Sequence, residues 1–163
     1  MKRFLLAVLM VVVMAGSALA TASSVTCTKY VPAYTDERHS NVAVLTVTWT
    51  ADSGNASVTS TNILALSDCQ YTRGYITRIV TNPGATGPTD DLTDVTLLDA
   101  DGVDVTGGAL QNRDNTDSEI AYCLAPDGAT IVYPYVVDTL TLAVANNAVN
   151  SAVQAVVIYI EMD

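Results

Sequence analysis

Hydrophobic and polar residues alternate along several short stretches of the chain. Along residues 42–50, Leu45, Val47 and Trp49 fall on one face of an extended strand, while a valine and two threonines fall on the other. This period of two predicts a half-buried strand in which Trp49 anchors the core. Similar runs predict strands at residues 56–60, 74–81, 94–98, 119–124, 130–137, 139–145 and 152–161. The last stretch is apolar almost throughout, so we expect it to lie in the centre of a sheet.

Turn-forming residues separate these stretches. Gly, Asn and Asp accept positive φ angles or cap their own backbone, and Pro presets φ for a turn. They cluster at residues 52–55, 82–84, 100–102, 107–108, 126–128 and 146–147. Closely spaced strands without amphipathic helices between them are typical of antiparallel folds. The sequence therefore predicts an all-β domain over residues 41–163, an antiparallel β-sandwich or jelly roll of about eight strands.

Three segments depart from this pattern. Residues 61–68 are the only candidate for a short helix. Pro134 lies inside an apolar run and marks it as an edge strand or a strand with a bulge, because proline has no N–H to donate. Residues 21–40 are polar and lack alternation, which predicts an N-terminal arm. The arm either lies over the domain or stays without fixed structure, or it packs on a neighbouring subunit.

The first 20 residues have the three parts of a cleavable secretory signal peptide. Lys2 and Arg3 provide the basic start, residues 4–14 are an apolar run, and Ala18-Leu19-Ala20 provides the small residues of a cleavage site. An uncleaved anchor is the alternative, but the apolar part is short for a membrane span of about 20 residues. We therefore expect a secreted protein, located outside the cell, in the periplasm or at the cell surface.

The composition without the signal peptide is acidic and rich in strand-forming residues. Five basic residues remain against seventeen acidic ones, a net charge of −12. Nucleic-acid binding needs a basic surface that displaces counterions, so the charge disfavours this class of protein. Threonine and valine account for 39 of the remaining 143 residues, and both favour strands. The acidic residues are spread along the chain, which is typical of a solvated surface.

Three cysteines, Cys27, Cys69 and Cys123, follow the signal peptide. An oxidising compartment allows one disulfide and leaves one thiol. Their spacing fits neither a zinc site nor a CxxC motif, and all three pairings are open. We expect Cys69–Cys123, because both residues lie near the ends of predicted strands. Cys27 would then stay buried or form a bridge to another subunit.

Residues 99–104 offer the best candidate for a metal site. Asp99, Asp101 and Asp104 surround Gly102, and calcium prefers such oxygen ligands. The EF-hand pattern, however, has three acids before the glycine and a glutamate after it, whereas Asp104 follows the glycine here. We therefore expect a β-hairpin that turns at Asp101-Gly102 and assign no metal site. A second acidic cluster consists of Asp90, Asp91 and Asp94. It would complete a calcium site only if the fold brings it close to residues 99–104.

No constellation of catalytic residues stands out. The only histidine, His39, lies in the predicted arm, where no acid would hold it rigidly as a Ser-His-Asp triad requires. No GxSxG motif occurs, and no carboxylate pair for glycoside cleavage can be singled out. Asn55-Ala56-Ser57 matches a glycosylation sequon, which we interpret as chance. The sequence thus predicts a protein that is not an enzyme and has no catalytic, cofactor or metal site; a carboxylate-dependent hydrolase is the lesser alternative.

Tyrosine is the main aromatic residue of the chain. It is enriched at interfaces because its ring buries area while its hydroxyl keeps a polar contact. Tyr133 and Tyr135 flank Pro134 and fall on the same face of the predicted edge strand, where they contact a subunit or a ligand, or else pack at the rim of the core. The other tyrosines are Tyr30, Tyr34, Tyr71, Tyr75, Tyr122 and Tyr159.

Part of the chain resembles a known group of proteins. The likeness rests on Ile76-Thr77-Arg78-Ile79-Val80-Thr81-Asn82-Pro83-Gly84, Pro88-Thr89-Asp90-Asp91, Asp94-Val95-Thr96-Leu97-Leu98-Asp99-Ala100-Asp101-Gly102-Val103-Asp104-Val105, Asn112-Arg113-Asp114 and Leu140-Thr141-Leu142. These motifs are similar to those of small, largely uncharacterised β-rich proteins from phage and prophage structural gene clusters, over roughly residues 74–160. The resemblance implies a virion-associated structural protein rather than an enzyme. A signal peptide departs from that pattern and suggests assembly at a surface or outside the cell.

These observations together predict a secreted structural or interaction protein. We expect a subunit of a homo-oligomeric extracellular or virion-like assembly, whose partners are further copies or a surface structure. Neither a nucleic acid nor, after cleavage of the signal peptide, a membrane is an expected partner. The alternative is a monomeric extracellular module that binds carbohydrate or calcium.

Overall fold

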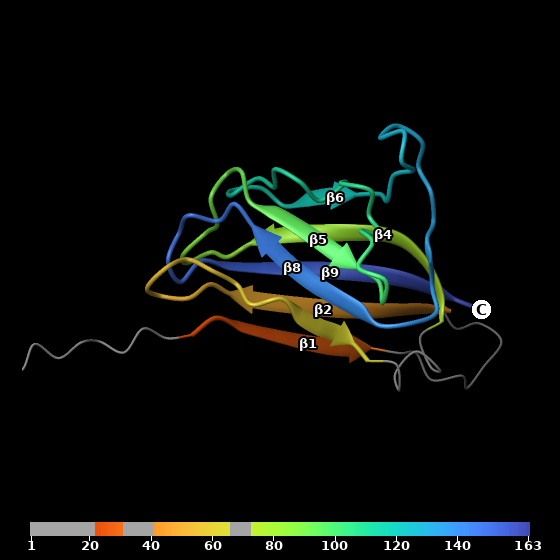
Figure 1. The fold of residues 1–163 in the computed structure, drawn as a ribbon, viewed down its shortest axis with the longest axis horizontal. Coiled ribbons are helices and arrows are strands. Elements are labelled where there is room, and N and C mark those ends of the chain that lie inside the picture. Colours follow the sequence, from red (N-terminus) through yellow and green to blue (C-terminus); the bar gives the residue numbers. More distant parts are fainter. Residues whose placement is uncertain (1–21, 31–40, 66–72) are drawn as a thin grey trace, which may run out of the picture.

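The computed structural model describes residues 22–30, 41–65 and 73–163, so the predicted signal peptide and residues 31–40 of the predicted arm lie outside the described residues. Nine strands in the described part form two antiparallel sheets (Figure 1). They are β1 (Ser24–Tyr30), β2 (Val42–Thr50), β3 (Thr61–Leu64), β4 (Gly74–Pro83), β5 (Asp94–Leu98), β6 (Glu119–Ala121), β7 (Tyr135–Val136), β8 (Leu140–Ala145) and β9 (Val153–Met162). The predicted all-β class with antiparallel strands is confirmed. None of these described residues forms a helix long and apolar enough to cross a bilayer.

The larger sheet has six strands in the order β1-β2-β9-β4-β6, with β7 also paired to β4, and the smaller sheet has the order β3-β8-β5. β9 occupies the middle of the larger sheet. It pairs over its length with β2, where Val42 lies opposite Glu161, and on its other edge with β4. The prediction that this apolar stretch is a central strand is therefore confirmed. Both edges of β9 find backbone partners within the sheet, as buried peptide groups require.

One hydrophobic core joins the two sheets. β2 alternates strictly between buried and partly exposed residues, and Leu45, Val47 and Trp49 are fully buried, as the period of two predicts. β9 repeats the alternation, and its buried apolar residues belong to the same cluster as Leu97 and Leu142 of the smaller sheet. Burying one such side chain stabilises the fold by about 1.5–3 kcal/mol, so this shared cluster holds the sheets together.

Three segments differ from the prediction. Residues 61–64, predicted as the start of a helix, form strand β3; a register shift within it leaves the neighbours Ile63 and Leu64 both buried. Residues 56–60, predicted as a strand, are irregular: Ala56 has a φ of 59° and its N–H donates back to the carbonyl of Asp52 at 3.1 Å. Strand β1, predicted as part of the arm, pairs along its whole length with β2 of the same chain.

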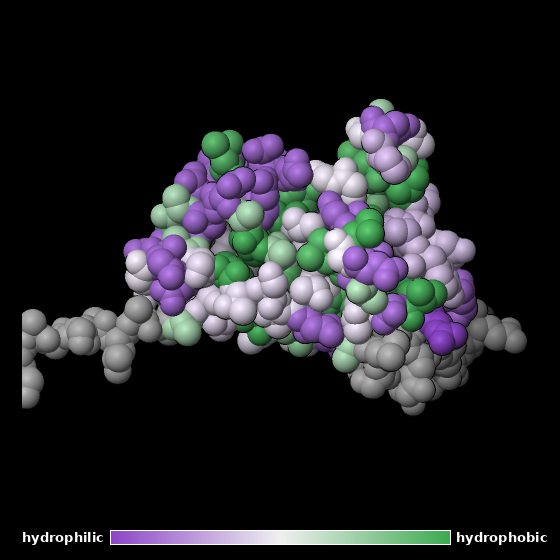
Figure 2. All heavy atoms as spheres, in the orientation of Figure 1, coloured by the Kyte–Doolittle hydropathy of each residue, from purple (hydrophilic) through white to green (hydrophobic). Residues whose placement is uncertain are grey.

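The edge beyond β4 consists of two short strands with a hairpin between them. β6 and β7 both pair with β4, and each covers only part of the strand predicted there. Between them the chain leaves the sheet as a hairpin, in which Leu124 pairs with Ile131. The hairpin projects from the body in Figure 1, and Figure 2 shows a mainly polar tip above an apolar base. Pro134 directly precedes β7, which pairs only with β4 among the described strands, so its predicted place at an edge is confirmed.

Candidate interaction surface

One face of the six-stranded sheet carries the core, and no described strand covers the other face. Side chains alternate between the two faces of a strand, so the partly exposed residues between the buried ones of β2 and β9 lie on this second face. We call the part of it that lies in three neighbouring cross-strand rows the open face. It comprises Ser24, Thr26, Thr28, Thr46, Thr48, Thr50, Val80, Asn82, Ile120, Val153, Ala155 and Val157.

Rows of side chains cross the open face from strand to strand. The longest row spans five strands and consists of Thr28, Thr46, Val157, Val80 and Ile120. The next row consists of Thr26, Thr48, Ala155 and Asn82. Cross-strand neighbours in such rows have Cβ atoms about 4.5–5.5 Å apart. The open face is therefore a continuous surface of methyl and hydroxyl groups.

The open face carries no charged residue, although the chain has seven basic and seventeen acidic residues. Ile120, at one end of the longest row, is 57% exposed. On the same side of the sheet, the next row contains Val44, Tyr159 and the charged Arg78, and the row after it contains Glu161. The open face thus lacks the repulsion that the rest of a strongly acidic surface exerts on a second copy.

Next to the open face, the same side of the sheet ends in a hollow. Tyr75, Thr77, Tyr133 and Glu161 line it among the described residues, and its volume is about 610 Å³. In the sheet, Tyr75 lies between Glu161 of β9 and Tyr135 of β7, so three strands meet there. We call this site the tyrosine hollow. Tyr133 and Tyr135, predicted to face a subunit or a ligand, are both exposed at this edge.

Contacts beside the tyrosine hollow hold its walls in place. The rings of Tyr75 and Tyr135 have centroids 4.8 Å apart and are tilted by 59°. The Tyr135 hydroxyl donates a hydrogen bond to the Asp163 carboxylate, which raises the pKa of Tyr135 above its ordinary value. The Thr77 hydroxyl donates to the carbonyl oxygen of Tyr159 at 3.4 Å. These contacts leave little freedom to the ring of Tyr75 and to the hydroxyl of Thr77.

The acidic residues around Gly102 form the predicted hairpin. The N–H of Asp99 donates to the carbonyl of Val103 at 3.0 Å. The carboxylate of Asp99 accepts the N–H groups of Asp101 at 3.0 Å and Val103 at 2.8 Å. That of Asp104 accepts backbone N–H groups just after it in the chain. These two carboxylates are engaged by the backbone of their own turns rather than pointed at a shared centre.

The second acidic cluster does not complete a site with the first. The carboxylate of Asp94 accepts the N–H of Asn112 at 2.8 Å and the side-chain amide of Asn146 at 2.6 Å. The carbonyl oxygen of Asp90 accepts the hydroxyl of Thr93 at 2.8 Å. In the described parts of the chain, no three or more His, Cys, Asp and Glu residues lie close enough to hold a metal ion.

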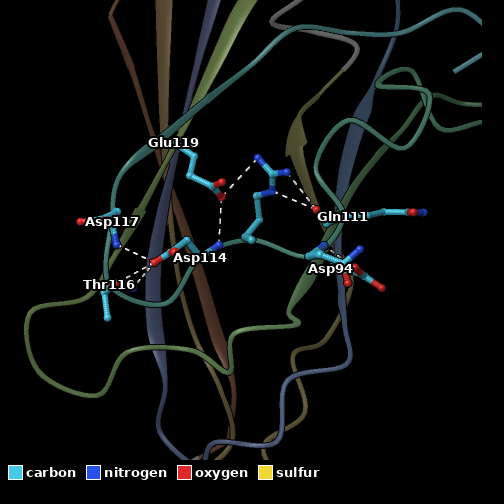
Figure 3. A network of polar contacts seen from close by, with 8 residues as sticks. Asp94, Gln111, Asp114, Thr116, Asp117 and Glu119 are labelled. Carbon is cyan, nitrogen blue, oxygen red and sulfur yellow. Dashed lines mark hydrogen bonds and ion pairs between the residues drawn. The ribbon is translucent and has the colours of Figure 1, made fainter. Parts of the chain in front are cut away.

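A network of polar contacts links the two sheets (Figure 3). Arg113 lies beside the start of β5 and forms an ion pair with Glu119 of β6 at 3.4 Å. The same carboxylate accepts the N–H of Asp114 at 2.9 Å. The carboxylate of Asp114 in turn accepts the N–H groups of Asp117 and Thr116, and these hydrogen bonds lower its pKa. We assign the network a structural role, because each carboxylate is occupied in holding the loop between β5 and β6.

The predicted disulfide between Cys69 and Cys123 is not formed. Cys123 is a free thiol that lies buried in the core cluster. Burial, with a smaller contribution from the charge of Asp104, raises the pKa of this thiol to about 12. Cys27 lies exposed on β1, and Cys69 is outside the described residues.

The remaining predicted candidates take no part in the open face or the tyrosine hollow. His39, Tyr34 and Tyr71 lie outside the described residues. The side-chain oxygen of Asn55, in the sequon, accepts the N–H of Ser57 at 3.0 Å and its hydroxyl at 2.7 Å. Two residues that the sequence did not single out also line the hollow, namely Thr77 and Glu161. The only sequence signal for Glu161 is that it is the one charged residue in a mostly apolar strand.

No protein-family model, curated protein or solved structure matches the chain. The resemblance to phage and prophage structural proteins therefore stays a prediction.

Proposed function

We propose that the protein is a non-enzymatic structural or interaction subunit that associates with copies of itself through the open face. The observation that carries this proposal is the absence of charge from three neighbouring rows of side chains, the longest of which spans five strands of an acidic protein. The centres of protein interfaces are depleted of charged residues. A broad exposed surface with many apolar groups on a soluble protein is typical of an interaction site.

Self-association explains the composition of the open face better than solvation does. A strand face that only meets water gains solubility from Lys, Glu and Asp, and the turns of this chain use Asp freely. On the open face, threonine occupies those positions instead. Threonine favours strands and can bury its methyl group while its hydroxyl finds a partner across an interface. A second copy meeting this face in an isologous contact would place like rows against like rows.

The proposal extends to the setting in which the subunit works. Removal of residues 1–20 as a signal peptide would place the protein outside the cytoplasm, and the resemblance to virion-associated proteins favours an extracellular or virion-like assembly. We also propose that the two sheets form a β-sandwich rather than a jelly roll. A jelly roll has eight strands in two Greek keys, whereas the sheets here have six and three strands around one core.

Light scattering coupled to size-exclusion chromatography tests the proposal over a range of protein concentrations. We expect an oligomer that is reduced to a monomer by Val157→Lys, in the middle of the longest row. Thr46→Lys, beside it in the same row, provides a second variant should the first destabilise the sheet. Val103→Lys is the control, because Val103 is the same residue type and is more exposed than Val157 but lies in the hairpin of residues 99–104. A monomer at every concentration for the unaltered protein would refute self-association.

A further inference from the structure

We propose that the tyrosine hollow is a binding site for a neutral saccharide unit. Its volume of about 610 Å³ lies within the range of about 300–1,000 Å³ that is usual for small-molecule sites. Its lining also has the usual composition of such sites, aromatic side chains with a few polar groups. Among the described residues two tyrosines, one threonine and one glutamate line it.

The tyrosines offer a sugar ring two apolar surfaces. Tyr75 is 45% exposed and Tyr133 is 55% exposed, which is high for residues whose rings gain most from burial. Tyr75 is also held in advance by its contact with Tyr135, which is itself anchored on Asp163. A platform that is already ordered loses little entropy when a ligand binds. The C–H face of a pyranose is the kind of surface that can lie on such a ring.

The polar groups of the hollow match the hydroxyl groups of a sugar. The carboxylate of Glu161 can only accept hydrogen bonds when ionised. The Thr77 hydroxyl already donates its hydrogen to the Tyr159 carbonyl, so its oxygen also acts as an acceptor. The hollow therefore presents acceptors beside aromatic rings, and a saccharide presents O–H donors beside a C–H face.

The charges around the hollow favour a neutral ligand. Two acidic residues, Glu161 and Asp163, and two basic ones, Arg73 and Arg78, lie in and beside it. Arg73 lies next to the chain end, where its carbonyl accepts the N–H of Asp163. Arg78 lies 3.9 Å above the ring of Tyr159, the strand neighbour of Glu161. A cationic or an anionic ligand would each meet one favourable and one unfavourable pair of charges.

Saturation-transfer NMR and calorimetry test the proposal with three neutral probes, maltotriose, cellotriose and triacetylchitotriose. We expect at least one of them to bind with a dissociation constant on the order of 1 mM, as suits a small open site. Tyr133→Ala should weaken this binding about tenfold or more, which corresponds to about 1.4 kcal/mol. Glu161→Gln should also weaken it, because a neutral amide is a poorer acceptor than a carboxylate.

Matched variants make the outcomes distinct. Tyr122→Ala removes a tyrosine of similar exposure that does not line the hollow, and it should bind the saccharide like the unaltered protein. Val157→Lys should also bind it unchanged, which separates this site from self-association through the open face. Failure of all three probes to bind, or equal binding by Tyr133→Ala, would overturn the proposal. So would a stronger response to choline that Glu161→Gln abolishes, because that result would assign the hollow to a cation.

Discussion

Gln154→Met should stabilise the protein. Gln154 lies on β9 and is fully buried, and neither atom of its side-chain amide has a hydrogen-bond partner. Directly opposite, on β2, the indole N–H of Trp49 also has no partner. Each buried polar group without a partner costs about 1–3 kcal/mol. Methionine has nearly the shape of glutamine and no such group, and a well-matched replacement in a core costs less than about 1.5 kcal/mol. The two amide atoms together cost about 2–6 kcal/mol, so after the replacement cost the free energy of unfolding should rise by at least about 0.5 kcal/mol.

Urea denaturation followed by tryptophan fluorescence measures this gain. Trp49 is the only tryptophan of the chain, so the emission reports directly on the part of the core that the substitution changes. A higher midpoint at an unchanged slope would show a gain in stability rather than a change in the unfolded state. Gln111→Met is the control, because Gln111 is exposed and a surface substitution should stay within about 0.5 kcal/mol. A loss of more than about 1 kcal/mol for Gln154→Met would refute the reasoning, since the amide would then have partners in the folded protein.

Three further predictions concern the turns, the sheet and the thiol. Hydrogen bonds from Thr130 and Ala129 lower the pKa of Asp127 to about 2, below its unfolded value of about 4. The contribution of Asp127 to stability is therefore present above about pH 4 and is lost as the pH falls towards 2. When the unfolding midpoint is measured against pH, Asp127→Asn should lose less stability over this range than the unaltered protein. Gly74→Ala should unfold the protein or lower its melting temperature strongly, because a Cβ there would lie 1.9 Å from the carbonyl oxygen of Glu161. Gly102→Ala is the control: a Cβ there would have no atom within 4 Å, but the residue has a φ of 77°. It should lower the free energy of unfolding by only about 1–2 kcal/mol, measured by thermal melting. Cys123 should resist alkylation by iodoacetamide at pH 8 until the protein is unfolded, because its thiol is buried and stays protonated. Rapid labelling of Cys123 in the folded protein, detected by mass spectrometry, would contradict this prediction.

The strands that could be predicted from the sequence are those with one buried and one open face. β2 and β5 have the predicted bounds, because Leu45, Val47 and Trp49, and likewise Val95 and Leu97, alternate with polar or partly exposed residues. β1 escaped prediction because it lies at the edge of the sheet and polar residues occupy both of its faces. In β3 a register shift places two buried residues side by side, so the period that identifies a strand is missing.

The candidate sites were predictable only in part, for a similar reason. Tyr133 and Tyr135 share a face by simple alternation, and this local rule needs no knowledge of the fold. The contact of Tyr75 with Glu161 depends on how β4 and β9 align, which includes a register shift between Ile76 and Arg78. No short-range pattern sets that alignment. The open face likewise becomes visible only when the five strands are placed in their order in the sheet.

The central position of β9 has a consequence for how the protein reaches its folded state. Among the described strands, β1 and β2 form hydrogen bonds with the β4 side of the sheet only through β9, and β9 follows all the other described strands along the chain. The pairing of Val42 with Glu161 spans most of the chain, and such distant pairing slows folding. Until β9 inserts, β2 and β4 each keep an unpaired edge, which is prone to aggregation. A chain built in this way can complete its larger sheet only after β9 has been synthesised, so β2 and β4 wait for most of the chain before they gain their shared partner.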